Sequence, residues 1–135
     1  MRVLVDTSIW IEYARSRPSL SSVSLSFLDL LLEDDRAVTI YPIQTEILSG
    51  NLSPHHYEDT RSSLEALHHV DCDWNHSEVW DELSKLAHRA RKNGLPIPGL
   101  VDPMILLAAK KSDVSLWTLD QALLKLATVV QVHLF

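Results

Sequence analysis

The stretch Val3-Leu4-Val5-Asp6-Thr7-Ser8, near the start of the sequence, decides the fold class. Its apolar, partly β-branched run predicts a short buried strand over residues 2–6, which ends at the first acidic side chain. Immediately afterwards, Ile9, Trp10 and Tyr13 recur with the spacing of a helix. A buried strand that passes directly into a helix is the opening of an α/β pattern.

The rest of the chain continues this alternation of strands and helices. Short apolar runs predict further strands at 37–41, 114–118 and 129–132. Helical spacing, with proline or aspartate near the starts and glycine beyond some ends, predicts helices at 19–33, 42–50, 54–69, 77–93 and 102–111, and one from residue 121. Four strands separated by helices predict an α/β fold with a mostly parallel central sheet and helices on both faces.

Length and charge narrow the possibilities further. The chain has 135 residues, of which 46% are hydrophobic and 22% charged, as in ordinary soluble proteins. A single domain over residues 1–135 is therefore expected. The formal net charge of −6 disfavours a generic basic nucleic-acid-binding protein. It does not exclude a nuclease, because carboxylates that bind divalent cations carry much of the negative charge in such a site.

The cysteine count and the apolar runs bear on the cellular compartment. Cys72 is the only cysteine, so it can form neither an internal disulfide nor a thiol metal site, and we expect it to be structural. The sequence turns polar at Asp6, too early for a signal peptide. No run approaches the roughly 18 apolar residues of a membrane span. We therefore expect a cytoplasmic protein that does not enter membranes.

Two common kinds of site lack their sequence signals. With only three glycines, the chain has no glycine-rich phosphate loop, so no nucleotide cofactor is expected. The seven histidines include adjacent pairs at 55–56 and 68–69, and none has the spacing of a helical zinc site. The acidic residues are therefore more informative than the glycines, the histidines or the cysteine.

Of four candidate acidic residues, three occupy positions where parallel sheets carry functional sites. Asp6 and Asp120 follow predicted strands. Asp102 opens a predicted helix and Glu46 lies within another. Sites in open parallel sheets gather beyond the carboxyl ends of the strands. Each acid also has a simpler interpretation, because the aspartates can cap helices and the glutamate can be a solvated helix residue. Acids that converged would repel one another unless they were protonated or shared a cation.

The order of four motifs resembles a known family. These motifs are Val3-Leu4-Val5-Asp6-Thr7-Ser8, then Pro42-Ile43-Gln44-Thr45-Glu46-Ile47-Leu48-Ser49-Gly50, then Asp102-Pro103-Met104-Ile105, and finally Trp117-Thr118-Leu119-Asp120. No single motif is specific, but their order and spacing resemble the PIN-domain ribonucleases, in particular VapC-type toxins of type II toxin–antitoxin systems. The resemblance extends over essentially the whole chain.

The resemblance implies a metal-dependent endoribonuclease that hydrolyses RNA phosphodiester bonds. By it, the family's metal-site acids correspond to Asp6, Glu46, Asp102 and Asp120, and Ser8 supports the first of them. The expected cofactor is Mg²⁺ or Mn²⁺, because these ions prefer oxygen ligands. The expected partners are an RNA substrate, a cognate VapB-type antitoxin and a second copy of the chain in a homodimer.

The chain departs from the family pattern at two positions. Ala122 stands where a second acid often follows the last aspartate, which weakens any claim of a second metal ion. Pro103 follows the third acid, where an aliphatic residue is frequent. Because proline is tolerated in the first turn of a helix, we do not interpret Pro103 as a loss of function.

Two other functions remain open at this stage. A haloacid-dehalogenase-type phosphatase also starts from an aspartate after a strand, but it needs a second acid two residues later, where this chain has Ser8. A catalytically silent binding module with the same fold is the other possibility. The presence of all four family acids argues against it.

Two sets of surface residues are candidates for contacts with partners. Several basic side chains could contact the RNA backbone, namely Arg89, Arg91, Lys92, Lys110 and Lys111. The helix dipole also favours cations at the end of a helix, so a solvated helix end explains these residues without any ligand. Apolar residues of two early helices could contact an antitoxin or belong to the core, namely Trp10, Tyr13, Phe27, Leu28 and Leu31.

Overall fold

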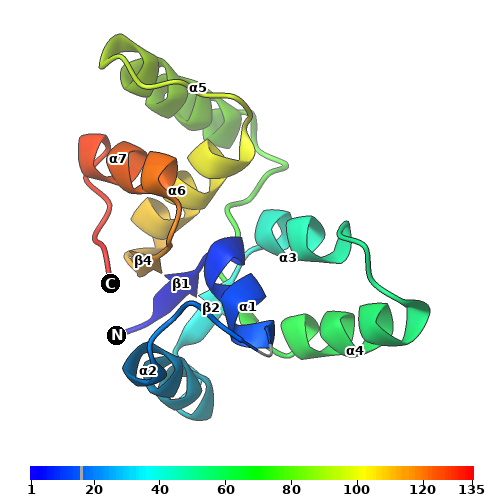
Figure 1. The fold of residues 1–135 in the computed structure, drawn as a ribbon. Coiled ribbons are helices and arrows are strands. Elements are labelled where there is room, and N and C mark those ends of the chain that lie inside the picture. The colour runs from blue at the N-terminus through cyan, green and yellow to red at the C-terminus, as the bar shows by residue number, and fades with distance from the viewer. Residues whose placement is uncertain (16) are drawn as a thin grey trace.

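The computed structural model describes residues 1–15 and 17–135, and Figure 1 shows their arrangement. Strands and helices alternate along most of the chain. Their bounds are β1 (Val3–Val5), α1 (Thr7–Ala14), α2 (Ser22–Glu33), β2 (Ala37–Thr39), α3 (Tyr41–Leu48), α4 (Pro54–Glu65), β3 (His68–His69), α5 (Ser77–Lys92), α6 (Val101–Ser112), β4 (Ser115–Trp117) and α7 (Gln121–Val129).

The four strands form one sheet in the order β3-β2-β1-β4, and every pairing between them is parallel. The predicted α/β fold with a parallel sheet is therefore confirmed. After β1 the chain adds β2 and β3 on one side of that strand and later returns to add β4 on the other side. The point where the order reverses lies at the carboxyl ends of β1 and β4, which is where parallel sheets bind ligands.

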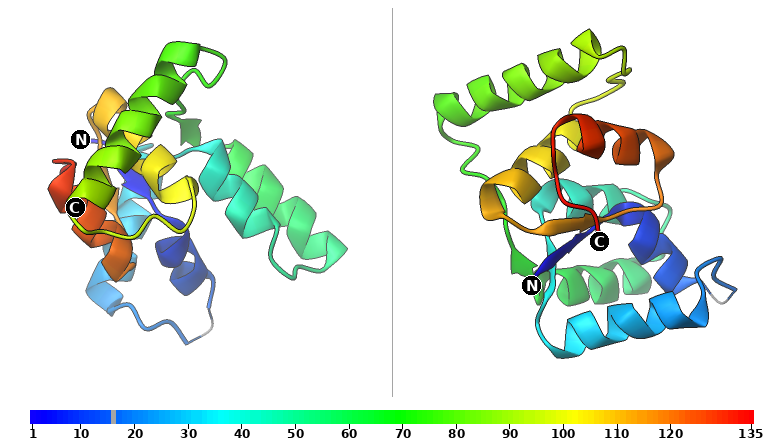
Figure 2. Two further views of the ribbon diagram at one scale, coloured as in Figure 1. Left: turned by 90° about the horizontal axis from the view of Figure 1, so that it is seen from above. Right: turned by 90° about the vertical axis from the view of Figure 1, so that its left-hand side faces the viewer.

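The sheet buries both of its faces, as predicted. Side chains alternate along a strand, so Leu4 joins one hydrophobic cluster while its neighbours Val3 and Val5 join another. The larger cluster contains residues of α5, α6 and α7, and the smaller one contains residues of α1 and α2. Figure 2 shows the layers from two further sides, with α5 outermost above α6. Helices thus cover both faces.

The strand predicted at 129–132 is wrong. Helix α7 continues to Val129, and the chain then turns at Gln131, whose φ is 61°. The valines that suggested a strand are used for helix packing and for the turn, since Val130 and Val132 are buried in the larger cluster. Only Leu134, further on, forms an isolated parallel bridge with Leu116 of β4.

The helix predicted at 54–69 ends early, and its last residues form a strand instead. Helix α4 stops at Glu65, and His68 and His69 pair with Val38 and Thr39 of β2. A strand of two residues is too short to show a period in the sequence, so the pairing with β2 decides its conformation. Among residues 1–15 and 17–135, none of the helices combines the length and apolar character that a membrane crossing needs.

Candidate active site

The carboxyl ends of β1 and β4 hold the first part of the candidate site. Asp6 follows β1 directly and is only 6% exposed. Its Oδ2 accepts hydrogen bonds from the hydroxyls of Ser8, at 2.8 Å, and Thr118, at 2.7 Å. Two hydroxyl donors compensate the carboxylate for the water it loses on burial and fix its orientation. Ser8 therefore contacts Asp6 directly, as its predicted supporting role requires.

Thr118 is a residue that the sequence analysis quoted in a motif but did not assign to the site. Besides donating to Asp6, its Oγ1 accepts a hydrogen bond from the backbone N–H of Asp120 at 3.0 Å. The hydroxyl thus joins the residues that follow two neighbouring strands. The sequence did contain a signal for this role. Thr118 lies between a strand end and a candidate acid, and a buried hydroxyl there needs a hydrogen-bond partner.

Asp102 lies in the middle of the acidic group. Burial is the main cause that raises the pKa of its carboxyl, from 3.8 to about 6, and the charges of Asp120, Asp6 and Glu46 raise it further. Asp102 is near enough to the three other acids for their charges to act on its carboxyl. The fold therefore brings together the four acids that the sequence singled out, although they come from four separate segments of the chain.

Glu46 is an exposed member of this group. It lies on α3, and its Oε1 accepts a hydrogen bond from the hydroxyl of Thr7 at 2.9 Å. Thr7 is the second residue that the sequence analysis left without a role. Because Thr7 begins α1, this bond ties the glutamate to the segment that carries Asp6.

Helix capping explains only one of the three aspartates. Asp120 is the N-cap of α7, and its Oδ1 accepts hydrogen bonds from the backbone N–H groups of Ala122 and Leu123. Asp6 occupies the N-cap position of α1, but its side chain makes no capping bond. Asp102 is not a cap, because α6 starts at Val101 after Leu100. For Asp6 and Asp102 the interpretation as simple caps is therefore wrong.

The donor chemistry of the group fits a hard divalent cation, since every candidate ligand is a carboxylate oxygen. In the described residues, however, no three His, Cys, Asp or Glu side chains come close enough to share one ion directly. Mg²⁺ in proteins commonly keeps several waters and uses one or two carboxylates. The arrangement thus suits an ion that is bound by one or two of these acids and reaches the others through water.

Glu46 separates two hollows in the surface. The first, which we call the apolar groove, has a volume of about 730 Å³ and lies between α1, α3 and α4. Its apolar lining includes Trp10, Ile11, Ile47, Leu52 and Leu64. Of the two early helices, Trp10 and Tyr13 line this groove, whereas Leu28 and Leu31 are buried in the smaller cluster and Phe27 is exposed on α2.

The second hollow, which we call the aromatic pocket, has a volume of about 460 Å³. It lies where α3, the start of α5 and the start of α6 meet. Its lining consists of Tyr41, Pro42, Thr45, Glu46, Ser49, Trp74, Trp80, Val101 and Met104. The pocket therefore reaches both the candidate acid on α3 and the two residues that flank Asp102 and Pro103 on α6.

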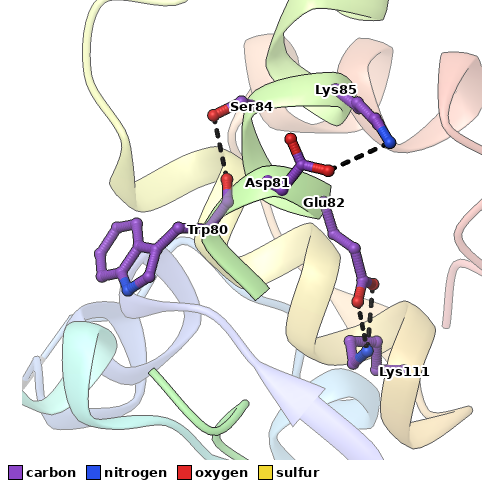
Figure 3. A network of polar contacts seen from close by, with 6 residues as sticks. All are labelled: Trp80, Asp81, Glu82, Ser84, Lys85 and Lys111. Carbon is purple, nitrogen blue, oxygen red and sulfur yellow. Dashed lines mark hydrogen bonds and ion pairs between the residues drawn. The ribbon is translucent and has the colours of Figure 1, made fainter. Parts of the chain in front are cut away.

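Most of the predicted RNA-contacting basic residues have partners within the chain. Lys111 pairs with Glu82 of α5 at 2.9 Å, as Figure 3 shows. Arg91 donates to the carbonyl of Ile97 at 2.9 Å, and Lys110 donates to the carbonyl of Val130 at 3.0 Å. These three side chains hold helices and loops in place. For Arg89 and Lys92, at the end of α5, contact with RNA stays a prediction.

Comparison with proteins of known sequence supports the resemblance. The chain is 40% identical over 65 residues to the VapC ribonuclease Mb1587 of Mycobacterium bovis, a match that covers 48% of this chain and 45% of the relative. The ribonuclease VapC11 of Mycobacterium tuberculosis matches to the same extent. The chain thus spans about half the length of the curated relatives it matches. No protein-family model matches it.

Comparison with solved structures concerns the fold. The crystal structure of FitAcB from Neisseria gonorrhoeae superposes with a TM-score of 0.70 at 19% identity, covering 98% of this chain and 96% of that one. A structure of FitAB bound to a DNA fragment gives the same TM-score at 18% identity, covering 98% and 93%. The predicted resemblance to VapC-type ribonucleases and the predicted fold are therefore both confirmed.

Proposed function

We propose that this chain is an endoribonuclease that depends on Mg²⁺ or Mn²⁺ and acts as the toxin of a toxin–antitoxin pair in the cytoplasm. The observation that carries the proposal is the environment of Asp102, a partly buried carboxyl that feels the charges of Asp6, Glu46 and Asp120. Such crowding is costly unless a proton or a cation compensates it. The similarity to ribonucleases of the VapC type supports RNA as the substrate.

Each acid has its own part in this proposal. Asp6 and Asp102 are the principal ligands of the ion, and Glu46 and Asp120 orient water around it. A bound Mg²⁺ or Mn²⁺ supplies an activated water and neutralises charge that develops on the phosphate oxygens. Ser8 and Thr118 hold Asp6 through its Oδ2, which fixes the direction of the carboxylate. Thr7 does the same for Glu46.

The apolar groove is the proposed binding site for the antitoxin. It is continuous with the acids through Glu46, and Ile11, 46% exposed on α1, offers it an accessible aliphatic side chain. A partner segment with apolar side chains would bury this surface, and a basic side chain on it would reach the acids. A VapB-type antitoxin, as the family resemblance implies, has this chemistry. We also expect a homodimer on the same basis.

A cleavage assay on total RNA tests the proposal. The purified protein should cut RNA when Mg²⁺ or Mn²⁺ is present, lose this activity in EDTA and regain it when the ion is restored. Full activity in the chelator would exclude metal dependence. A protein that binds Mn²⁺ at these acids but cuts no RNA would instead be the silent binding module.

The phosphatase alternative receives no support from the geometry. A haloacid-dehalogenase-type enzyme needs an acid two residues after its nucleophile, and this position is Ser8, whose hydroxyl donates to Asp6. A hydroxyl in that bond cannot take the place of a carboxyl as a general acid or base. Hydrolysis of a phosphomonoester such as p-nitrophenyl phosphate should therefore remain at background.

A further inference from the structure

We propose that the aromatic pocket receives an unstacked nucleobase of the RNA, next to the phosphodiester bond that is cleaved. This inference rests on the proposed function and adds a subsite to it. The pocket and the acidic group share Glu46, and Val101 and Met104 line the pocket from the same turn of α6 that carries Asp102. A nucleotide whose phosphate lies at the acids therefore has its base within reach of the pocket.

The three aromatic side chains of the pocket are fixed by hydrogen bonds. The indole N–H of Trp80 donates to the carbonyl of Trp74 at 2.7 Å, and that of Trp74 donates to Asp71 at 3.3 Å. The hydroxyl of Tyr41 donates to Glu65 at 3.3 Å. With their polar atoms engaged at the edges, these residues present ring faces that lose little freedom when a planar group binds.

The rings are also accessible. Trp80 is 42% exposed and Tyr41 is 48% exposed, large fractions for aromatic side chains. One side of Tyr41 is stacked on His69, with ring centroids 4.3 Å apart, and the rings of Trp74 and Trp80 are 5.7 Å apart. Figure 3 shows the indole of Trp80 extending to the side of α5 away from the Glu82–Lys111 pair. Such rings are typical stacking surfaces for single-stranded nucleic acid.

Charge favours a base over a phosphate as the occupant. The carboxylates of Asp71 and Glu65 bracket the aromatic side chains, and they already accept hydrogen bonds from Tyr41, Trp74 and Gln44. Negative charge at the rim repels a phosphate but tolerates a neutral base. A base inside a duplex is stacked on its neighbours and cannot enter, so the pocket selects single-stranded segments.

The inference is tested by binding, in the Asp102→Asn background so that the RNA stays intact. The probe is a fluorescent single-stranded RNA of about 12 nucleotides, compared with a duplex of the same sequence. Trp80→Ala should weaken binding of the single strand about 10-fold and leave binding of the duplex unchanged. Trp80→Phe, which keeps a ring, should restore most of the loss. Tyr57→Ala is the matched control, because Tyr57 is also an exposed aromatic residue but lies on α4 outside the pocket.

Three results would overturn the inference. The first is equal loss for single strand and duplex, which would indicate a general structural role for Trp80. The second is no loss for the single strand. The third is a parent dimer that Trp80→Ala converts to a monomer in sedimentation, which would show that a second copy of the chain covers the pocket.

The same variants separate this inference from the proposed function. A parent that cleaves RNA, with an unchanged KM in Trp80→Ala, contradicts the subsite alone. A protein that binds single strands through Trp80 but cuts no RNA with Mn²⁺ contradicts the nuclease proposal and leaves the subsite standing.

Discussion

The apolar groove and the aromatic pocket lie on either side of Glu46 and have different linings. The groove, at about 730 Å³, is lined by aliphatic side chains such as Ile11, Ile47 and Leu64 together with the aromatic side chains of Trp10 and Tyr13. The pocket, at about 460 Å³, has three aromatic side chains in its lining, those of Tyr41, Trp74 and Trp80. A wide apolar groove suits the side chains of a protein segment, and ring faces fixed by hydrogen bonds suit planar groups. By the proposals above, the RNA substrate approaches the acids from the side of the pocket and the antitoxin from the side of the groove.

The largest expected effect concerns the centre that both hollows share. Asp102→Asn keeps the size of the side chain but removes its charge, so the proposed ion loses a principal ligand. We expect RNA cleavage with Mn²⁺ to fall by at least about 100-fold, as is typical when a group that stabilises the transition state is lost. Initial rates of cleavage measure this loss, and circular dichroism should show an unchanged fold.

The Asp102→Asn protein also provides its own control. Because Asp102 is not the N-cap of α6, asparagine there should not disturb the helix start. Parental cleavage together with parental stabilisation by Mn²⁺ would remove Asp102 from the site.

The second prediction separates the groove from the pocket. Ile11→Asp places a charge on the exposed aliphatic side chain of the groove, and we expect it to weaken binding of the antitoxin by about 10-fold or more, because the charge must be desolvated. Cleavage of RNA should be unaffected. The proposed antitoxin is sought as a small protein encoded next to this one, and co-purification together with growth of co-expressing cells measures the interaction.

Val23→Asp is the matched control for the groove. Val23 is 63% exposed on α2 and does not line the groove, so this variant should bind the antitoxin like the parent. Equal weakening by both substitutions would show that the partner does not recognise this groove.

The fold could be predicted wherever the sequence pattern and the packing agree. Residues 3–5 form a strand because their apolar run is buried on both faces of the sheet. The same type of run misled at 129–132, because valines that pack a helix end and a turn look like those of a strand. The short strand at 68–69 depends on its pairing with β2, which local sequence does not encode.

The site could be predicted as a set of residue types but not as a set of contacts. The three aspartates stand at strand ends or a helix start, positions that the sequence reveals, whereas Glu46 lies within a helix and was assigned by the family resemblance. That Thr118 joins Asp6 to the backbone of Asp120 depends on β1 and β4 being neighbours, although they are far apart in the chain. Likewise, the aromatic pocket combines residues of α3, α5 and α6 that only the tertiary fold brings together.

The third prediction tests the contact of Thr118 with Asp6 and Asp120. Thr118→Val keeps the shape of the side chain but removes the hydroxyl that donates to Asp6 and accepts from the N–H of Asp120. Leaving buried groups without partners costs about 1–3 kcal/mol, so the free energy of unfolding should fall by this amount. Cleavage should fall by about 10-fold, because Asp6 loses one of its two fixed donors. Thr118→Ser, which keeps the hydroxyl, should recover both properties in urea unfolding and RNA cleavage. A Val variant as stable and active as the parent would show that Ser8 alone suffices.

The smallest expected effect is the pH dependence that the burial of Asp102, together with the charges of the other acids, causes in the absence of divalent ions. Its carboxyl has a pKa of about 6 in the folded chain against 3.8 ordinarily, so folding takes up a proton between these values. The free energy of unfolding therefore falls as the pH rises through this window and levels off above it. The full shift corresponds to about 3 kcal/mol, which solvent screening of this partly exposed group reduces to about 1 kcal/mol.

Asp102→Asn isolates this contribution, because asparagine does not titrate. In EDTA, the variant should match the parent near about pH 4 and become more stable by about 1 kcal/mol near about pH 7. Adding Mn²⁺ at neutral pH should reverse the order, because the ion stabilises only the form that binds it. Thermal melts at several pH values, with and without Mn²⁺, measure both differences. A gap that stays constant with pH would mean that neither burial nor the charges of Asp120, Asp6 and Glu46 raise the pKa of Asp102.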